Sequence, residues 1–183
     1  MRLYHTGYQE IRQPDVHYGR KNADFGQGFY LTANEDFASR WARERKGEQT
    51  FVNSYELDLT GLQVHRFERD ADWFSYIFAN RRAMEDRYAE ADVIIGPIAN
   101  DTIFETFGIL TSGYLKDEEA LKLLQIDPCY EQVVLKTQKA ADHLTWLSSR
   151  IISGEEIASV RESVVREQEA YQAAFAEVMQ GFA

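Results

Sequence analysis

The sequence predicts an α+β domain followed by a long C-terminal helix, and three observations support this prediction. Hydrophobic residues make up 44% of the 183 residues and aromatic residues 13%, which is enough for one domain with a real core. Segments with strand-like alternation are interspersed with segments whose apolar residues recur at helical spacing. No Gly-x-Gly-x-x-Gly motif follows the first predicted strand, which disfavours the alternative of a doubly wound parallel sheet.

The N-terminal part is predicted to contain two short strands separated by a loop. Pro14 and the glycines between residues 7 and 28 mark the loop, because both residue types interrupt regular structure. Asn34 has the side chain of a helix N-cap, and Gly47 marks the end of the helix that follows. The predicted elements are strands at residues 2–6 and 29–32 and a helix at residues 35–46.

The central part is predicted to mix strands and helices. "FVNSYELDL" alternates as a strand does, and "DVIIGPI" is a short apolar run ended by Gly-Pro. The segment around Trp73 has apolar residues at helical spacing, with Trp73, Ile77 and Phe78 expected to face inward. The predicted elements are strands at residues 51–59, 62–67, 92–98 and 130–137 and helices at residues 70–91, 100–113 and 116–126.

From Ser153 onward the sequence predicts one long helix. Residues 151–183 carry six Glu and two Arg, so this segment contributes −4 to the net charge of −10. Two interpretations stay open: the helix docks on the same domain, or it binds a partner. Its predicted apolar stripe consists of Ile157, Val160, Val164, Tyr171, Phe175 and Val178.

Composition excludes several classes of protein. A net charge of −10 disfavours broad, sequence-independent binding to nucleic acid, which relies on a cationic surface. No apolar run approaches the roughly 20 residues that span a bilayer, and the N-terminus lacks the apolar core of a secretory signal. The lone Cys129 precludes an internal disulfide. These features predict a cytoplasmic protein that does not enter a membrane.

Standard motifs for metals and nucleotides are absent. The histidines at positions 5, 17, 65 and 143 show no ligand spacing, so no metal site is predicted. No phosphate-binding loop ending in Lys-Ser or Lys-Thr and no His-Glu-x-x-His occur. The Asp-Phe-Gly at residues 24–26 comes too early for a kinase and lacks the kinase motifs around it.

Five segments together resemble the ADP-ribosyltransferase superfamily in its His-Tyr branch. They are "LYHTG" with His5, "DFGQGFYLT" with Tyr30, "DFASRWA", "GPIAND" and "EQVVLKT", in that order, and they cover roughly residues 1 to 146. The chain is most similar to an uncharacterised bacterial family within that superfamily. The resemblance implies a split, mostly antiparallel β-sheet with flanking helices. It divides the chain into an ADP-ribosyltransferase-like domain at residues 1–150 and the C-terminal helix at residues 151–183.

The resemblance also implies NAD as co-substrate, with nicotinamide leaving from a ribose carbon that becomes oxocarbenium-like, as in glycoside chemistry. His5 would donate to a ribose hydroxyl, Thr6 would add a hydroxyl contact, and the backbone at Gly7 would meet the nicotinamide amide. In this sequence Thr6 stands between the His and the Gly that are adjacent in the family. Tyr30 would stack on the nicotinamide ring.

The turn before Tyr30 has its own expected roles. Gly26 and Gly28 would allow close approach of a ligand to the backbone. Asp24 would either cap the turn or meet the substrate. Arg20 and Lys21 either contact a pyrophosphate or belong to a solvated loop.

The third catalytic position departs from the superfamily pattern. Active members commonly have Glu on a later strand, whereas the matching position here is Gln132, with Glu131 beside it. Strand neighbours point to opposite faces, so only one of the two can face the site. An amide holds a ribose hydroxyl but offers less help to a developing positive charge. Asp101 is an alternative source of that charge, or a helix cap.

The function predicted by the resemblance is transfer of ADP-ribose from NAD to a macromolecule, protein or nucleic acid. Such bacterial proteins often serve as toxins of toxin–antitoxin or phage-defence loci, so an antitoxin protein is an implied partner. The alternatives are an NAD glycohydrolase, a non-catalytic NAD- or ADP-ribose-binding protein, and an interaction module centred on the C-terminal helix.

Overall fold

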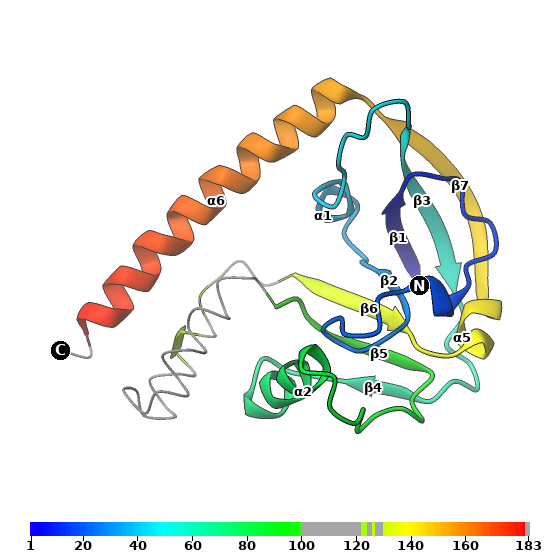
Figure 1. The fold of residues 1–183 in the computed structure, drawn as a ribbon, viewed down its shortest axis with the longest axis horizontal. Coiled ribbons are helices and arrows are strands. Elements are labelled where there is room, and N and C mark those ends of the chain that lie inside the picture. Colours follow the sequence, from blue (N-terminus) through cyan, green and yellow to red (C-terminus); the bar gives the residue numbers. More distant parts are fainter. Residues whose placement is uncertain (100–121, 124–125, 127–129, 182–183) are drawn as a thin grey trace.

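The computed structural model describes residues 1–99, 122–123, 126 and 130–181 (Figure 1). Its elements are β1 (Arg2–Gly7), the 3-10 turn η1 (Val16–Tyr18), β2 (Phe29–Leu31), α1 (Glu35–Ser39), β3 (Thr50–Leu57), β4 (Val64–Arg66), α2 (Ala71–Arg81), β5 (Val93–Pro97), β6 (Glu131–Leu135), α5 (Gln138–Asp142), β7 (Leu144–Ile152) and α6 (Gly154–Gln180).

The described strands form two sheets, of order β1-β3-β7 and β2-β6-β5-β4. All neighbouring strands run antiparallel except β4 and β5, which are parallel. A bridge between Tyr4 and Thr32 connects β1 with the end of β2 through reciprocal backbone hydrogen bonds of 2.8 and 3.0 Å. The α+β class, the mostly antiparallel sheets and the long C-terminal helix are therefore confirmed (Figure 1).

Strand β6 lies inside its sheet and is buried on both faces. Val133 and Leu135 enter one hydrophobic core, whereas Val134 between them enters a second core. This follows from the alternation of side chains along a strand. The first core lies between the two sheets, and the second lies against α2, where Trp73 Nε1 donates a hydrogen bond of 2.9 Å to the carbonyl of Pro97. Strand β6 thereby connects both halves of the molecule.

Helix α1 is shorter than predicted. It begins at the Asn34 cap, whose side chain accepts from the amide of Phe37, but it ends at Ser39 rather than continuing to residue 46. The amides of Arg40, Trp41 and Ala42 bond to carbonyls three residues earlier, so the helix tightens into 3-10 turns at its end. Residues 43–49 are exposed, and no buried face supports further helix there.

Helix α2 is also shorter than the predicted range of residues 70–91. It begins after the N-cap Asp70, whose side chain accepts from the amides of Asp72 and Trp73, and it ends at Arg81. Ala83 beyond it has a left-handed φ of 55°. Residues beyond it turn back so that Asp86 reaches Lys136. The expected inward face is partly wrong, because Phe78 is only half-buried whereas Tyr76 is fully buried.

Two elements follow β6 that no prediction covers, α5 and the nine-residue strand β7. Strand β7 ends at Ile152, so the first sheet extends two residues past the predicted boundary at residue 150. The predicted helices at residues 100–113 and 116–126 lie outside the described residues, apart from Lys122, Leu123 and Ile126.

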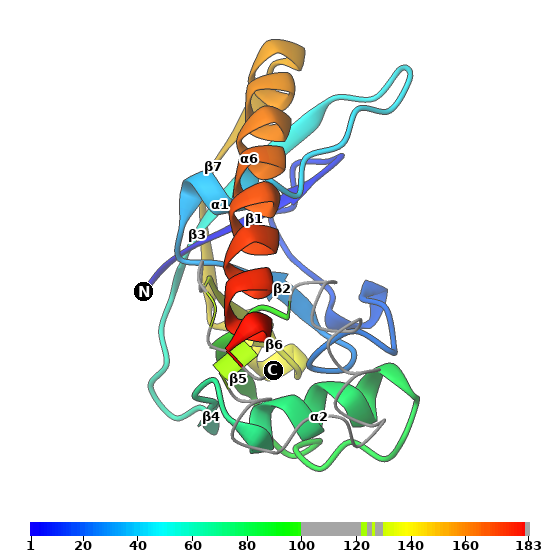
Figure 2. The same cartoon turned by 90° about the vertical axis from the view of Figure 1, so that its left-hand side faces the viewer.

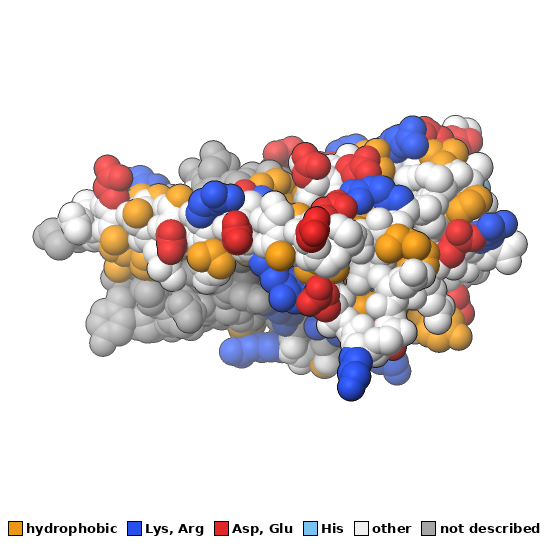
Figure 3. Space-filling view, turned by 90° about the horizontal axis from the view of Figure 1, so that it is seen from above, with side chains coloured by type: hydrophobic (Ala, Val, Ile, Leu, Met, Phe, Trp, Pro, Cys, Tyr) orange, Lys and Arg blue, Asp and Glu red, His pale blue; other side chains and the backbone are white. Residues whose placement is uncertain are grey.

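Helix α6 begins at the Ser153 cap and runs for 27 residues along one side of the molecule (Figure 2). Of the predicted apolar stripe, Ile157 and Tyr171 are buried, and the other members are half-buried. Charged and hydrophobic side chains are interspersed over the face of the molecule seen in Figure 3. None of the helices within the described ranges has both the length and the apolar character needed to cross a membrane.

Candidate functional site

A cavity of about 390 Å³ brings together side chains that are far apart in the sequence. His5 and Thr6 come from β1, Tyr30 from β2 and Gln132 from β6, and Asp24 comes from the turn before β2. Five of the predicted site residues therefore line one cavity. The same cavity is also lined by two cationic side chains, Arg20 and Arg81, and by the aromatic side chain of Trp41.

The pairing of strands explains this meeting. The bridge between Tyr4 and Thr32 places β1 beside β2, and β2 pairs with β6 so that Tyr30 lies opposite Val134. Gln132 is two residues from Val134 and therefore points to the same face of the sheet as Tyr30. Three separate strands thus converge on one side of the second sheet.

His5 is held in a defined orientation. Its Nδ1 lies 2.7 Å from the carbonyl oxygen of Tyr30, and its ring packs on that of Phe29 at a centroid distance of 4.4 Å. Burial lowers the pKa of His5, and the bond to the Tyr30 carbonyl only partly opposes this shift. A carbonyl accepts but cannot donate, so Nδ1 carries the proton and the neutral ring presents Nε2 as an acceptor. A ligand hydroxyl would therefore donate to His5, the reverse of the predicted direction.

The Tyr30 side chain makes hydrogen bonds to the turn that precedes it. Its hydroxyl donates to the carbonyl of Gly26 at 2.7 Å and accepts from the amide of Phe25 at 2.9 Å. Burial raises the pKa of this hydroxyl, so it stays protonated and able to donate. Tyr30 is therefore both a wall of the cavity and a brace for residues 24–26.

All three carbonyls of the Asp-Phe-Gly turn accept a hydrogen bond from a side chain. Asn80 Nδ2 donates to Asp24 at 3.1 Å, Lys136 Nζ donates to Phe25 at 2.8 Å, and Tyr30 donates to Gly26 at 2.7 Å. Satisfying every acceptor of a turn fixes its shape.

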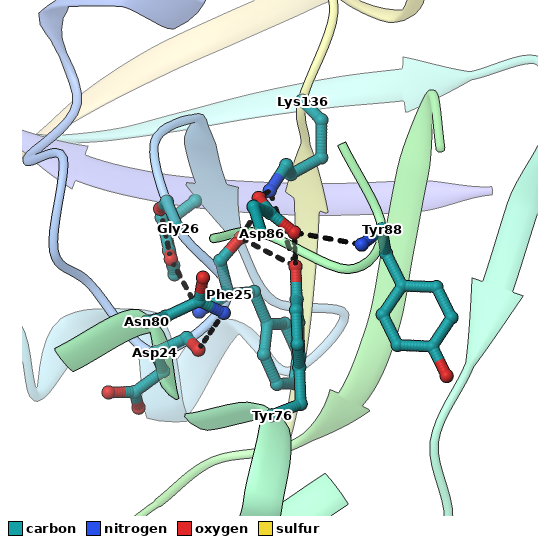
Figure 4. A network of polar contacts seen from close by, with 9 residues as sticks. Asp24, Phe25, Gly26, Tyr76, Asn80, Asp86, Tyr88 and Lys136 are labelled. Carbon is teal, nitrogen blue, oxygen red and sulfur yellow. Dashed lines mark hydrogen bonds and ion pairs between the residues drawn. The ribbon is translucent and has the colours of Figure 1, made fainter. Parts of the chain in front are cut away.

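Lys136, which donates to the Phe25 carbonyl of the turn, is itself held by an ion pair. Its ammonium group contacts the carboxylate of Asp86, which also accepts from the Tyr76 hydroxyl at 2.7 Å and from the Tyr88 amide at 3.0 Å (Figure 4). Only 6% of the Lys136 side chain is exposed. A lysine buried this far is stable only with such partners.

The space beside Gly26 and Gly28 of the motif is occupied by other groups of the protein. A Cβ at Gly26, whose φ is 76°, would lie 2.8 Å from Lys136 Nζ, and one at Gly28 would lie 2.5 Å from the carbonyl oxygen of Leu135. Gly28 also lines a second cavity, so close approach of a ligand there stays a prediction. At Gly7 a Cβ would lie 3.4 Å from His5 Nε2, so this glycine lies directly beside the histidine ring.

Gln132 is the feature that most indicates a ligand. The residue is 3% exposed, and its Nε2 has no hydrogen-bond partner within the described part of the chain. A buried amide donor without a partner costs about 1–3 kcal/mol. Glu131 points the other way, where it is exposed and lies 3.6 Å from Arg66.

Asp24 forms an ion pair with Arg81, whose Nε lies 2.5 Å from Oδ1 of the carboxylate. Arg20 also lines the cavity and is exposed, and no carboxylate partner of Arg20 is found among the described residues. Thr6 lines the cavity, but its hydroxyl donates to the carbonyl of Ala38 at 2.5 Å. Arg81 and Trp41 were not predicted as site residues. Trp41 belongs to "DFASRWA", one of the five segments that carry the resemblance, whereas nothing near Arg81 in the sequence marks a site.

A second cavity of about 540 Å³ shares His5 and Tyr30 with the first. Its outer wall is the loop at residues 9–15, which Asn53 and Tyr55 hold in place. Asn53 accepts from the amide of Ile11 at 2.9 Å, and the Tyr55 hydroxyl donates to the carbonyl of Ile11 at 2.7 Å. The two cavities flank the His5–Tyr30 contact, and each has the size of a site for a small organic ligand, roughly 300–1,000 Å³.

The arrangement offers a neutral histidine acceptor, an amide donor and a cation around one cavity, which suits a polyhydroxylated, anionic ligand. Asp101 and Cys129 lie outside the described residues. Among the residues that the structure places, no cluster of His, Cys, Asp and Glu has the geometry of a metal site.

Comparison with known proteins adds one match. The family described as "Protein of unknown function (DUF3990)" matches residues 1–146. No curated protein matches the chain. The matched range includes every candidate site residue named above, whereas α6 lies beyond it.

Proposed function

The chain belongs to the DUF3990 family of proteins of unknown function, and we propose that it is an NAD-dependent ADP-ribosyltransferase acting on a macromolecule. The proposal includes the split sheet of that superfamily and a cytoplasmic location. A role as toxin or defence effector, with an antitoxin protein as partner, rests on the sequence resemblance alone.

One observation carries the proposal. His5, Tyr30 and Gln132, which the resemblance names as the catalytic set, come from three strands and line one cavity. Residues 5 and 132 are separated by most of the domain, so this meeting is not a consequence of local sequence. If they had lain on opposite sides of the molecule, the proposal would have been lost.

The residues present fit NAD as co-substrate. The unpaired Nε2 of Gln132 needs an acceptor, which a ribose oxygen would provide. The neutral His5 ring would accept from a ribose hydroxyl, and Arg20 would meet a phosphate, since guanidinium groups match phosphate oxygens well. When bound, NAD supplies a glycosidic bond whose nicotinamide is a good leaving group.

The chain's own residues would orient this ligand rather than attack it. Tyr30 would form a flat wall, and its bond to Gly26 would keep that wall fixed. His5 and Gln132 would hold the sugar from two strands, which fixes its orientation. Trp41 would exclude water from the side of α1, because it lines the same cavity.

A second function is favoured by a specific observation. The only carboxylate of the described residues that lines this cavity is Asp24, and it is paired with Arg81. A developing positive charge on the sugar therefore has no free carboxylate beside it in that part of the chain. Binding of NAD or ADP-ribose without turnover is the alternative that this observation supports.

The test incubates the protein with radiolabelled NAD, with and without a cell lysate, and follows thermal stability in the same samples. Transfer of label to protein or nucleic acid supports the transferase. Free ADP-ribose alone supports glycohydrolysis, and a rise in Tm without turnover supports binding only.

His5→Ala should abolish the response to NAD, whereas His143→Ala should not, because His143 bonds to the carbonyl of Asp58 away from the cavity. At Tyr30 the variant is Tyr30→Phe rather than Tyr30→Ala, because Tyr30 braces the turn and the ring has to be kept. No change in melting temperature and no product with excess NAD would refute all NAD-based functions.

A further inference from the structure

Glu167 on α6 contacts the domain through its carboxylate. Glu167 forms an ion pair with both terminal nitrogens of Arg40, and the hydroxyl of Tyr130 donates to the same carboxylate at 3.2 Å. The Arg40 guanidinium lies over the Tyr130 ring at 4.8 Å, and Tyr130 stacks on Phe37 at 4.1 Å. The bidentate bond to Arg40 lowers the pKa of Glu167, so the carboxylate is charged at neutral pH.

Both partners of Glu167 adjoin the candidate site. Tyr130 precedes β6 and stands two residues before Gln132, while Arg40 directly precedes Trp41. Gln132 and Trp41 line the candidate cavity. A displacement of the Arg40–Tyr130 pair would therefore move two walls of that cavity.

The other end of α1 is tied to α6 as well. Arg150 lies 3.3 Å from the carboxylate of Glu35 and makes two bonds of 2.8 and 2.9 Å to Glu156. Glu156 and Glu167 are separated by about three helical turns, so they lie on the same face of α6. Through Arg150 and Arg40, these two residues of α6 are connected to the two ends of α1.

A cavity of about 270 Å³ separates α6 from the candidate site. It is lined by Glu167 and Tyr171 on α6 and by Trp41 and Ala99, which also line the candidate cavity. The two cavities thus share a wall. Glu167 and its partners Arg40 and Tyr130 also line the 270 Å³ cavity.

We propose that Glu167 is a positioning residue of the candidate site, through which α6 sets the places of Trp41 and Gln132. The helix lies outside residues 1–146, which the family model matches. The inference rests on the proposed function for its ligand, but the contact itself does not depend on that ligand.

The experiment compares Glu167→Gln with Glu169→Gln in the full-length protein. The first removes the charge and keeps the size, and the second makes the same change at an exposed position of the same helix. Two quantities are measured: the Kd for NAD, and hydrogen–deuterium exchange without ligand in peptides that cover residues 35–41 and 130–133. Arg40→Ala, Glu167→Ala and their combination complete a double-mutant cycle.

We expect Glu167→Gln to weaken NAD binding about fivefold or more, in line with typical couplings between distinct sites. Exchange should rise in residues 35–41 and 130–133 and stay unchanged in β3, while Glu169→Gln should match wild type in both. The double variant should bind no more weakly than either single alanine variant, because all three remove one contact. A purely structural role would lower Tm and raise exchange throughout.

The outcomes separate the two proposals. If wild type binds NAD and Glu167→Gln binds it equally well with unchanged exchange, the positioning role is overturned and the proposed function stands. If wild type does not bind NAD, the proposed function fails, and exchange alone decides the inference. Faster exchange of Glu167→Gln in residues 35–41 and 130–133 then supports the positioning role, and exchange equal to that of wild type overturns it.

Discussion

Replacing Gln132 with Leu should stabilise the protein while removing its response to NAD. The Gln132 side chain is buried, and its Nε2 finds no acceptor in the described structure. An unsatisfied buried donor costs about 1–3 kcal/mol, and Leu fills a similar volume without one. For a chain of this length, a gain of about 1–3 kcal/mol corresponds to a rise in Tm of about 2–12 °C.

The contrasting variant is Asn53→Leu, at another deeply buried amide side chain. Asn53 donates to the carbonyl of Gln9 at 3.1 Å and accepts from Ile11 and from Ser149 at 2.9 and 2.6 Å. Leu at this position leaves those groups without a partner, so it should destabilise the protein by at least about 2 kcal/mol. The two substitutions are alike in chemistry and opposite in expected sign.

The assay is thermal unfolding with and without NAD, by differential scanning fluorimetry and by circular dichroism. Wild type at 100 times its Kd should gain about 2.7 kcal/mol from the ligand, and Gln132→Leu should gain none. If Gln132→Leu lowers the melting temperature as Asn53→Leu does, the Gln132 amide is satisfied in the free protein. The reasoning that it awaits a ligand would then be wrong.

Three further outcomes test the framework around the site. Lys136→Met should cost about 3–5 kcal/mol in urea unfolding, because it leaves the Asp86 carboxylate without its buried cation, and adding Asp86→Asn should recover part of that loss. Asp92 is buried, which opposes ionisation, yet hydrogen bonds from the Gln63 amide and from neighbouring side chains hold its pKa at about 2, below its ordinary value of 3.8. Its contribution to stability is therefore complete above about pH 4 and is lost as the pH falls toward 2, so the gap in urea midpoint between wild type and Asp92→Asn should close over that range. Gly28→Ala should destabilise the protein by about 1–3 kcal/mol through overpacking against Leu135. Gly47→Ala should destabilise it by about 1–2 kcal/mol, because the backbone of Gly47 is left-handed while the space around it is open. Melting temperatures of both variants equal to that of wild type would contradict these two estimates.

Patterns that repeat within a few residues were predictable from the sequence. The cap at Asn34, the strand at "DVIIGPI" and the helix after Ser153 are all present, because each depends on local spacing or on one side chain. The strand at Leu144–Ile152 was not predicted. It lies at the edge of its sheet with most side chains exposed, and a bulge opposite Ser54 and Tyr55 interrupts its alternation.

The gathering of the site residues was predictable only through the family resemblance. Nothing in the spacing of His5, Tyr30 and Gln132 says that their strands become neighbours. The path of the chain after α2 involves a distant partner, because Asp86 contacts Lys136, fifty residues away. The Arg40–Glu167 contact joins residues 127 positions apart, so no local pattern could indicate it.

Strand β6 has a consequence for the order of events during synthesis. The half of the site made first, in β1 and β2, cannot be completed until β6 inserts between β2 and β5 and Lys136 secures the turn. A nascent chain that has emerged only as far as α2 therefore carries His5 and Tyr30 without a formed cavity. Contacts of such long sequence separation also slow the final step of folding, and the cavity can close only after most of the domain has left the exit tunnel.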